Sequence, residues 1–233
     1  LDKPGHEISL EAVPEVTLPP RFVCRGGEKL AAALEALPVQ VKGRCCLDAG
    51  ISTGGFSDCL LQHGASRIYG IDVGYGQTAW SLRQDPRVVL RERTNLRHLT
   101  PEDLYGPGDP QPDLAVADLS FISLSRVLEP MQGLLAGGPQ AEAVLLVKPQ
   151  FEVGRERVGK GGVVRDPKAH ADAIALVAAA AEPLQWFPQG LVGSPITGAA
   201  GNHEYLLWLG PIAELDSNAW TALIEQVVQR TNA

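Results

Sequence analysis

Short, uninterrupted apolar runs recur along the chain at a spacing that is typical of an α/β protein. Strands buried on both faces of a parallel sheet have this pattern, because neither face requires polar side chains. Five such runs lie at residues 45–47, 67–71, 88–90, 114–117 and 143–147. Two later runs, at residues 191–192 and 205–209, would complete the sheet. The pattern therefore predicts a mostly parallel, seven-stranded sheet.

Helix-compatible stretches separate most of these runs. Their apolar residues recur at helical spacing, at Leu30, Leu34 and Leu37, at Val127, Leu128, Met131 and Leu135, and at Ile174 and Val177. A helix over residues 56–63 is expected to stop at Gly64. A closing helix is expected after Ser217, with an apolar face made of Trp220, Leu223, Ile224, Val227 and Val228. Helices that alternate with parallel strands cover both faces of the sheet, so the predicted fold class is α/β and Rossmann-like.

The composition is that of a globular protein, with 233 residues of which 45% are hydrophobic and 20% charged. No apolar run approaches the ~20 residues that a membrane-spanning helix needs, so we expect no membrane partner. The four cysteines are Cys24, Cys45, Cys46 and Cys59. They form no CxxC pair and have no histidines at ligand spacing, so we expect no metal site and a reducing, cytoplasmic location.

The net charge of −7 by itself disfavours a nucleic-acid partner, because phosphate binding needs clustered Lys and Arg. Two stretches depart from this average. Residues 21–44 carry five basic and two acidic residues, and residues 148–168 carry six basic and three acidic ones, so each is net +3. The second stretch is rich in glycine and follows a predicted strand, where ligands bind in such sheets. A local field of this kind can attract an anionic partner to an acidic protein.

The first chemical signal is a glycine-rich turn at residues 47–56, between the first predicted strand and a helix. Glycines there allow the backbone to approach a cofactor closely. Asp72 ends the second strand, 24 residues after Asp48, at a separation that suits an acidic side chain on a ribose. The turn is neither GxGxxG nor a P-loop. A tight turn without a ligand and a dinucleotide site remain the alternatives.

The second signal is a pair of opposite charges at the ends of two predicted strands. Asp118 follows the fourth strand and Lys148 follows the fifth. Either residue alone would be an ordinary solvated strand end. Because the carboxyl ends of neighbouring parallel strands share one edge, we expect the two side chains to meet at the mouth of a site.

Seven motifs resemble, in the same order, those of the TlyA (haemolysin A) family of FtsJ-like methyltransferases. They lie at residues 22–30 (FVCRGGEKL), 50–56 (GISTGGF), 72–77 (DVGYGQ), 118–124 (DLSFISL), 148–152 (KPQFE), 159–166 (GKGGVVRD) and 201–205 (GNHEY). The resemblance implies a class I S-adenosylmethionine-dependent methyltransferase fold over residues 21–233. It also implies that residues 1–20 are the remnant of an S4 RNA-binding domain and its linker. The expected reaction is methylation of a ribose 2′-hydroxyl in ribosomal RNA, at a cytidine.

FtsJ-like enzymes use a Lys-Asp-Lys-Glu tetrad, and the matching positions are Lys29, Asp118, Lys148 and Glu204. The expected cofactor is S-adenosyl-L-methionine. Its predicted contacts, from the glycine-rich turn and from the resemblance, are Asp48, Gly50, Ser52, Gly54, Gly55, Phe56, Asp72, Asn95 and Asp118. Asn95 departs from the pattern, because many FtsJ-like relatives have an acidic residue facing the adenine there. An Asn amide can still donate and accept at that edge.

The sulfonium of the cofactor is already activated, so the protein has to align the reactants and remove a proton. Lys148 is the candidate base, or the cation that stabilises the developing alkoxide. A second cation, Lys29, would help to make Lys148 neutral. Asp118 is expected near the methionine end of the cofactor, and Glu204 to hold a lysine or the ribose. A simple ion pair between Glu204 and Lys29 is the alternative.

The expected partner is ribosomal RNA or a ribosomal subunit, with no obligate protein partner. The candidate RNA contacts are Arg25, Arg155, Arg157, Lys160 and Arg165. His203 is expected to face away from the site, because neighbours on a strand point in opposite directions. The four tryptophans are expected to pack in the core. Alternative functions are a haemolysin-like, membrane-perturbing protein, a non-catalytic cofactor-binding protein and a nicotinamide-dependent oxidoreductase.

Overall fold

The computed structural model describes residues 20–232. Its strands are β1 (Cys45–Ala49), β2 (Arg67–Ile71), β3 (Val88–Arg91), β4 (Leu114–Ala117), β5 (Glu142–Val147), β6 (Phe187–Gly193) and β7 (Tyr205–Gly210). Its helices are α1 (Gly26–Ala36), α2 (Gly55–Gln62), α3 (Trp80–Gln84), α4 (Pro101–Leu104), α5 (Leu128–Gly133), α6 (Pro149–Glu152), α7 (Pro167–Ala181) and α8 (Ser217–Thr231). All seven predicted strands are present, which confirms the predicted fold class.

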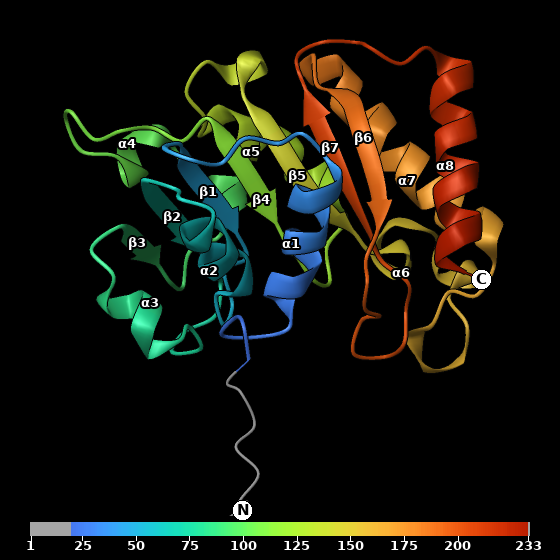
Figure 1. Ribbon diagram of the computed structural model, residues 1–233, viewed down its shortest axis with the longest axis horizontal. Coiled ribbons are helices and arrows are strands. Elements are labelled where there is room, and N and C mark those ends of the chain that lie inside the picture. Colours follow the sequence, from blue (N-terminus) through green and yellow to red (C-terminus); the bar gives the residue numbers. More distant parts are fainter. Residues whose placement is uncertain (1–19, 233) are drawn as a thin grey trace, which may run out of the picture.

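The strands form one sheet in the order β3-β2-β1-β4-β5-β7-β6. The pairs from β3 to β5 are parallel, whereas β7 runs antiparallel to both β5 and β6 (Figure 1). The order of the strands reverses between β1 and β4, because the chain winds outward from β1 in one direction and from β4 in the other. In open α/β sheets a ligand binds at such a switch point, outside the carboxyl ends of the strands.

Helices cover both faces of the sheet, and alternate strand residues contribute to two separate cores. Cys46 and Val144 face the core formed with α1 and α2. Leu47 and Leu145 face the core formed with α5, α7 and α8. Figure 1 shows α1 and α2 on one face of the sheet and α7 on the other. This double coverage explains why the central strands are apolar without alternation, as the sequence predicted.

Several predicted element boundaries were wrong. Leu37 lies outside α1 in extended conformation, because the following proline disfavours a helical backbone. Val127 precedes α5 and Leu135 lies beyond it, so α5 is shorter than the apolar spacing indicated. Ser217 is the first residue of α8, and the helix is capped by Asp216, whose carboxylate accepts a hydrogen bond from the Ala219 N–H at 2.8 Å.

Two further expectations differ from the structure. β3 is an edge strand whose residues are only partly buried, because no strand covers its outer side. Trp80 is 74% exposed and does not pack in the core, whereas Trp186 is fully buried. The predicted S4 remnant falls almost entirely on residues 1–19, which lie outside the described residues, so it stays a prediction. Within residues 20–232, no helix is both long and apolar enough to span a membrane.

Candidate active site

A cavity of about 990 Å³ opens at the carboxyl edge of the sheet, beside the switch point between β1 and β4. The turn after β1 forms one wall, and the ends of β4 and β5 form another. All four tetrad positions line it, as do most of the predicted cofactor contacts. These lining residues are Lys29, Asp118, Lys148 and Glu204, together with Gly50, Ser52, Gly55, Phe56, Asp72 and Asn95.

The glycine-rich turn is fixed by the neighbouring strand and by close packing of helices. Gly50 and Ile51 donate their N–H groups to the Ile71 carbonyl at 2.8 and 3.1 Å. A Cβ on Gly55 would lie 2.6 Å from the Cys24 sulfur, so only glycine lets the starts of α1 and α2 approach this closely. Gly54 does not line the cavity. It has a φ of 101°, and a Cβ there would lie 2.0 Å from Leu82, so its role is to shape the turn.

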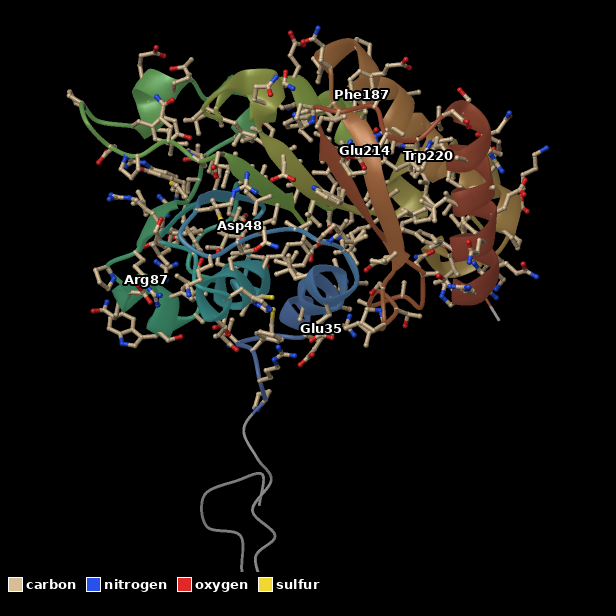
Figure 2. All side chains as sticks on the ribbon, turned by 45° about the horizontal axis from the view of Figure 1, so that its top comes forward. Glu35, Asp48, Arg87, Phe187, Glu214 and Trp220 are labelled. Atoms are coloured by element: carbon tan, nitrogen blue, oxygen red, sulfur yellow. The ribbon has the colours of Figure 1, made fainter. Side chains whose placement is uncertain are left out.

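Asp48 also lies outside the cavity wall, which corrects its prediction as a direct cofactor contact. Its side chain is fully buried and accepts a hydrogen bond from the Ser57 hydroxyl at 2.6 Å, whereas its Oδ1 has no partner among the described residues. Figure 2 shows Asp48 in the interior, in contrast to Arg87 and Glu35 at the periphery. Burial raises the pKa of Asp48 to about 7. Asp48 therefore stabilises the turn from the protein interior, through its hydrogen bond with Ser57.

Asp72 is held ready to accept further hydrogen bonds at the end of β2. Its Oδ2 accepts from the Ser52 N–H and its Oδ1 from the Gly74 N–H, both at 2.7 Å. Each carboxylate oxygen has a second lone pair, which matches the two hydroxyls of a ribose. Asn95 follows β3, and its Oδ1 accepts from the Arg97 N–H at 3.1 Å. The Asn95 NH₂ group makes no hydrogen bond with the described residues and can donate to a ligand in the cavity.

The predicted meeting of Asp118 and Lys148 is confirmed. The Lys148 Nζ lies 2.7 Å from an oxygen of Asp118 and donates to the Ser120 hydroxyl at 3.0 Å. Lys148 is 8% exposed. The pairing of β4 with β5 brings the two residues together. Ala117 is the register partner of Leu145; Asp118 directly follows Ala117, and Lys148 lies three residues after Leu145.

The second ion pair joins Lys29 of α1 to Glu204, which directly precedes β7. Both side chains are buried: 7% of the Lys29 side chain and 3% of the Glu204 side chain is exposed. The structure thus brings all four charged residues to one cavity but divides them into two pairs. Lys29 is neutralised by Glu204, so it does not act on Lys148 as a free cation in the way that the sequence predicted. The Lys29–Glu204 pair proposed as an alternative is present, and it lies in the cavity wall rather than away from it.

The segment after Asp118 is fastened to the segment after Lys148 by contacts that the sequence did not indicate. Glu152 accepts hydrogen bonds from the Ser123 hydroxyl at 2.6 Å and the Leu124 N–H at 2.9 Å. Burial raises the pKa of Glu152. Phe121 lies between these anchors with a φ of 65°, is 91% exposed, and lies 5.3 Å from the Phe151 ring. An exposed aromatic side chain thereby lines the mouth of the cavity on an anchored segment.

The candidate RNA contacts fall into two groups. Arg25, Arg155, Lys160 and Arg165 are exposed, and no ion pair to any of them is found within residues 20–232. Arg157 differs, because its guanidinium pairs with both Asp166 and Asp172, at 3.3 and 2.7 Å. Its charge is therefore largely compensated by these two carboxylates, in contrast to the other four cations.

His203 lies outside this cavity, as predicted, but the reason given from the sequence was wrong. It precedes β7, so strand alternation does not apply to it. His203 instead lines a second, smaller cavity of about 320 Å³, together with Arg165 and Asn232. Ser120 and Gln150 also line the main cavity; they lie within the motifs at residues 118–124 and 148–152 but were not predicted as site residues. The Gln150 Oε1 is buried without a partner among the described residues, so it is free to accept a hydrogen bond after a small movement.

The order of the strands, the glycine-rich turn and the acidic group after β2 define a Rossmann-like, S-adenosylmethionine-dependent methyltransferase. The sequence profile of the FtsJ-like methyltransferases matches residues 22–211, and the chain belongs to this family. Its fold is also that of fibrillarin from Aeropyrum pernix, whose structure contains S-adenosyl-L-methionine, with a TM-score of 0.52 and 16% identity over 77% of this chain and 73% of that chain.

Closer relatives share much more of the sequence. The 16S/23S rRNA (cytidine-2′-O)-methyltransferase TlyA of Mycobacterium tuberculosis is 54% identical over 188 residues, which cover 81% of this chain and 68% of the relative. YqxC of Bacillus subtilis, a candidate rRNA methyltransferase, is 50% identical over 210 residues, covering 90% and 73%. The crystal structure of a candidate hemolysin from Lactococcus lactis superposes with a TM-score of 0.83 and 42% identity, covering 91% of this chain and 99% of that one.

Proposed function

We propose that this protein transfers a methyl group from S-adenosyl-L-methionine to a ribose 2′-hydroxyl of ribosomal RNA, at a cytidine. The observation that carries the proposal is the Lys148 amine, held by Asp118 and Ser120 in the wall of the cavity that adjoins the glycine-rich turn. The ribosomal substrate and the cytidine follow the activity for which the related TlyA of Mycobacterium tuberculosis is named.

The residues of the cavity fit an adenosyl cofactor. Asp72 would accept from the two ribose hydroxyls, Asn95 would contact the adenine edge, and the backbone at Gly50 and Ser52 would lie along the cofactor. Asp118 would adjoin the methionine end. The cofactor supplies a methyl group that is already activated for transfer to a nucleophile. The protein therefore has to position an acceptor oxygen and remove its proton.

Lys148 is the residue placed for the removal of that proton. A neutral amine at this position would accept the proton of the 2′-hydroxyl, and an ammonium would stabilise the developing alkoxide. Asp118 and Ser120 fix the amine by contacts of 2.7 and 3.0 Å, so its orientation is set before the substrate arrives. Lys29 and Glu204 line the same cavity, and each buried charge is compensated by the other.

The rim of the cavity suits a single-stranded or extruded nucleotide. Phe121 offers a fixed, exposed ring next to the acceptor site, and bases of RNA loops stack on such rings. Arg25 lines the cavity and Lys160 directly precedes Gly161 in its wall, and both are exposed cations that can contact phosphates near the target. These charges concentrate the positive field at the cavity although the chain is acidic overall.

Mapping ribose methylation in ribosomes from cells with and without the gene tests the proposed function. We expect at least one 2′-O-methylated cytidine to be lost from ribosomal RNA when the gene is deleted, and to return when the wild-type gene is supplied. Supplying a Lys148→Ala gene should not restore it. An unchanged pattern of 2′-O-methylation in the deletion strain would contradict the proposal.

A further inference from the structure

The peptide groups around Val164 are held from two sides by buried side chains outside the tetrad. The Val164 N–H donates to the Asn202 Oδ1, and the Val164 carbonyl accepts from the His170 Nε2, each at 2.9 Å. Asn202 also donates its NH₂ group to the Gly162 carbonyl at 2.9 Å. Val164 is 1% exposed, Asn202 2% and His170 0%. The glycine-rich segment is therefore anchored at its end, although the glycines before it are exposed.

The contacts of His170 determine its tautomer. A carbonyl oxygen can only accept, so the Nε2 that contacts Val164 must carry the proton. The Nδ1 of the neutral ring then accepts from the Tyr205 hydroxyl at 2.8 Å. Asn232, directly after α8, donates to the Tyr205 oxygen at 3.0 Å. Each donor in the chain Asn232, Tyr205, His170 and Val164 thus meets an acceptor.

This chain of hydrogen bonds connects two walls of the active-site cavity. Gly161 and Gly162 line the cavity, and the same segment carries Lys160 and Arg165. At the other end of the chain, Tyr205 directly follows Glu204. A displacement of the glycine-rich segment would therefore change the position of two candidate phosphate contacts relative to the acceptor site.

We infer that His170 is a positioning residue that holds the glycine-rich segment, through the Val164 carbonyl, in the place where it contacts the RNA substrate. The inference rests on the proposed function for its RNA part only. His170 contacts neither the cavity nor the tetrad, so it acts through Val164 and Tyr205.

Protonation of the ring leaves the Val164 contact in place. Burial lowers the pKa of His170. The charged or titratable groups that face it are His203, with ring centroids 6.1 Å apart, Asp166 before α7, and Tyr205. A protonated ring carries a hydrogen on both nitrogens, so Nε2 still donates to the Val164 carbonyl. The new Nδ1–H can donate to the Tyr205 oxygen once the hydroxyl proton turns away, so only the direction of that hydrogen bond changes.

Two substitutions separate the contacts of the ring. His170→Gln places an amide NH₂ near the position of Nε2, so it can still donate to Val164, and it does not titrate. His170→Asn reaches only the position of Nδ1, so it can accept from Tyr205 but cannot reach Val164. Hydrogen–deuterium exchange of the peptide that contains residues 159–166 reports on the Val164 N–H directly and needs neither cofactor nor RNA. Methyl transfer to ribosomal RNA then gives the KM for RNA and kcat.

For His170→Asn we expect exchange in this peptide to accelerate by about three- to tenfold, as befits the loss of one hydrogen bond. The KM for RNA should rise by a similar factor, and the Kd for S-adenosylmethionine should stay unchanged. His170→Gln should behave like the wild type at pH 7.5, because its amide can still donate to the Val164 carbonyl. His98→Asn, at an exposed histidine, is the matched control and should change nothing.

Unchanged exchange in a folded His170→Asn protein would overturn the inference, as would a His170→Gln protein that exchanges as fast as His170→Asn. If His170→Asn does not fold, Tyr205→Phe provides the test, because it removes only the hydroxyl that orients the ring. For Tyr205→Phe at pH 7.5 we expect exchange about threefold faster than in the wild type. Unchanged exchange would overturn the inference. Accelerated exchange without any RNA methylation by the wild type would refute the proposed function and leave the anchor standing.

Discussion

Replacing Lys148 by alanine removes the group that the geometry assigns to proton transfer. The amine lies 2.7 Å from Asp118 and 3.0 Å from Ser120, and a methyl side chain at this position cannot reach the cavity. General base catalysis contributes roughly 10²–10⁴-fold to a rate, so we expect kcat to fall by that factor. The Kd for S-adenosylmethionine should change by less than about threefold, or about 0.7 kcal/mol. The reason is that the ribose and adenine contacts lie elsewhere.

The effect on stability should be smaller than the effect on activity. Breaking a fully buried ion pair costs about 3–5 kcal/mol, but the Asp118 side chain is 25% exposed and water can solvate it when Lys148 is gone. We therefore expect a loss well below that range, measured by urea unfolding. Single-turnover methyl transfer with saturating cofactor measures the chemical step. Lys148→Arg is the companion variant, because a guanidinium keeps the charge but cannot act as a base.

Two results would refute the reasoning on Lys148. Full single-turnover activity in the alanine variant would show that the amine takes no part in the reaction. Activity in Lys148→Arg within about tenfold of the wild type, at the low end of the contribution of a base, would show that a positive charge suffices and that another group removes the proton.

Three other substitutions test separate parts of the structure. Asp72→Asn should weaken S-adenosylmethionine by roughly ten- to a hundredfold in isothermal titration, because hydrogen bonds to a charged acceptor are worth about 1.5–3 kcal/mol; an unchanged Kd would place the ribose elsewhere. Wild-type stability should fall by up to about 1.4 kcal/mol per unit as the pH rises toward 7, since the pKa of Asp48 is about 7 when folded and lower when unfolded. Asp48→Asn should flatten this slope in urea unfolding at pH 5 and 7, and an equal slope would contradict the buried, neutral carboxyl. Lys29→Met should destabilise the fold by about 3–5 kcal/mol, because it leaves the buried charge of Glu204 without a partner. The double variant Lys29→Met with Glu204→Gln should lose clearly less stability, and equal losses would show that the pair is not coupled.

The sequence was sufficient to predict the sheet and the meeting of Asp118 with Lys148. Both depend on rules that act along short stretches: buried parallel strands are apolar, and their carboxyl ends share an edge. The convergence of Lys29 and Glu204 on the same cavity could not be derived from spacing, because 175 residues separate them, and it came from the resemblance to the family. Their direct pairing decides which charges remain free, and no local pattern records it.

Other features of the site have no signal in the sequence. Asp48 and Gly54 belong to the glycine-rich turn that the sequence predicts for the cofactor. In the structure Asp48 is buried and Gly54 packs on Leu82, whereas Gly50 and Ser52 line the cavity, and this difference is visible only in three dimensions. The anchor at Val164 joins residues from α7, β7 and the end of α8, each of which is unremarkable in its own segment. Hydrogen bonds between distant side chains depend on tertiary packing and cannot be inferred from periodicity.

The most direct test of the account is to identify the product of the purified protein. The protein is incubated with methyl-labelled S-adenosylmethionine and ribosomal subunits, the RNA is digested to nucleosides, and the labelled nucleoside is identified by mass spectrometry. The account predicts label in 2′-O-methylcytidine with the wild type, and its absence with Lys148→Ala at equal cofactor binding. Label on a base rather than on a ribose, or equal label with both proteins, would contradict it.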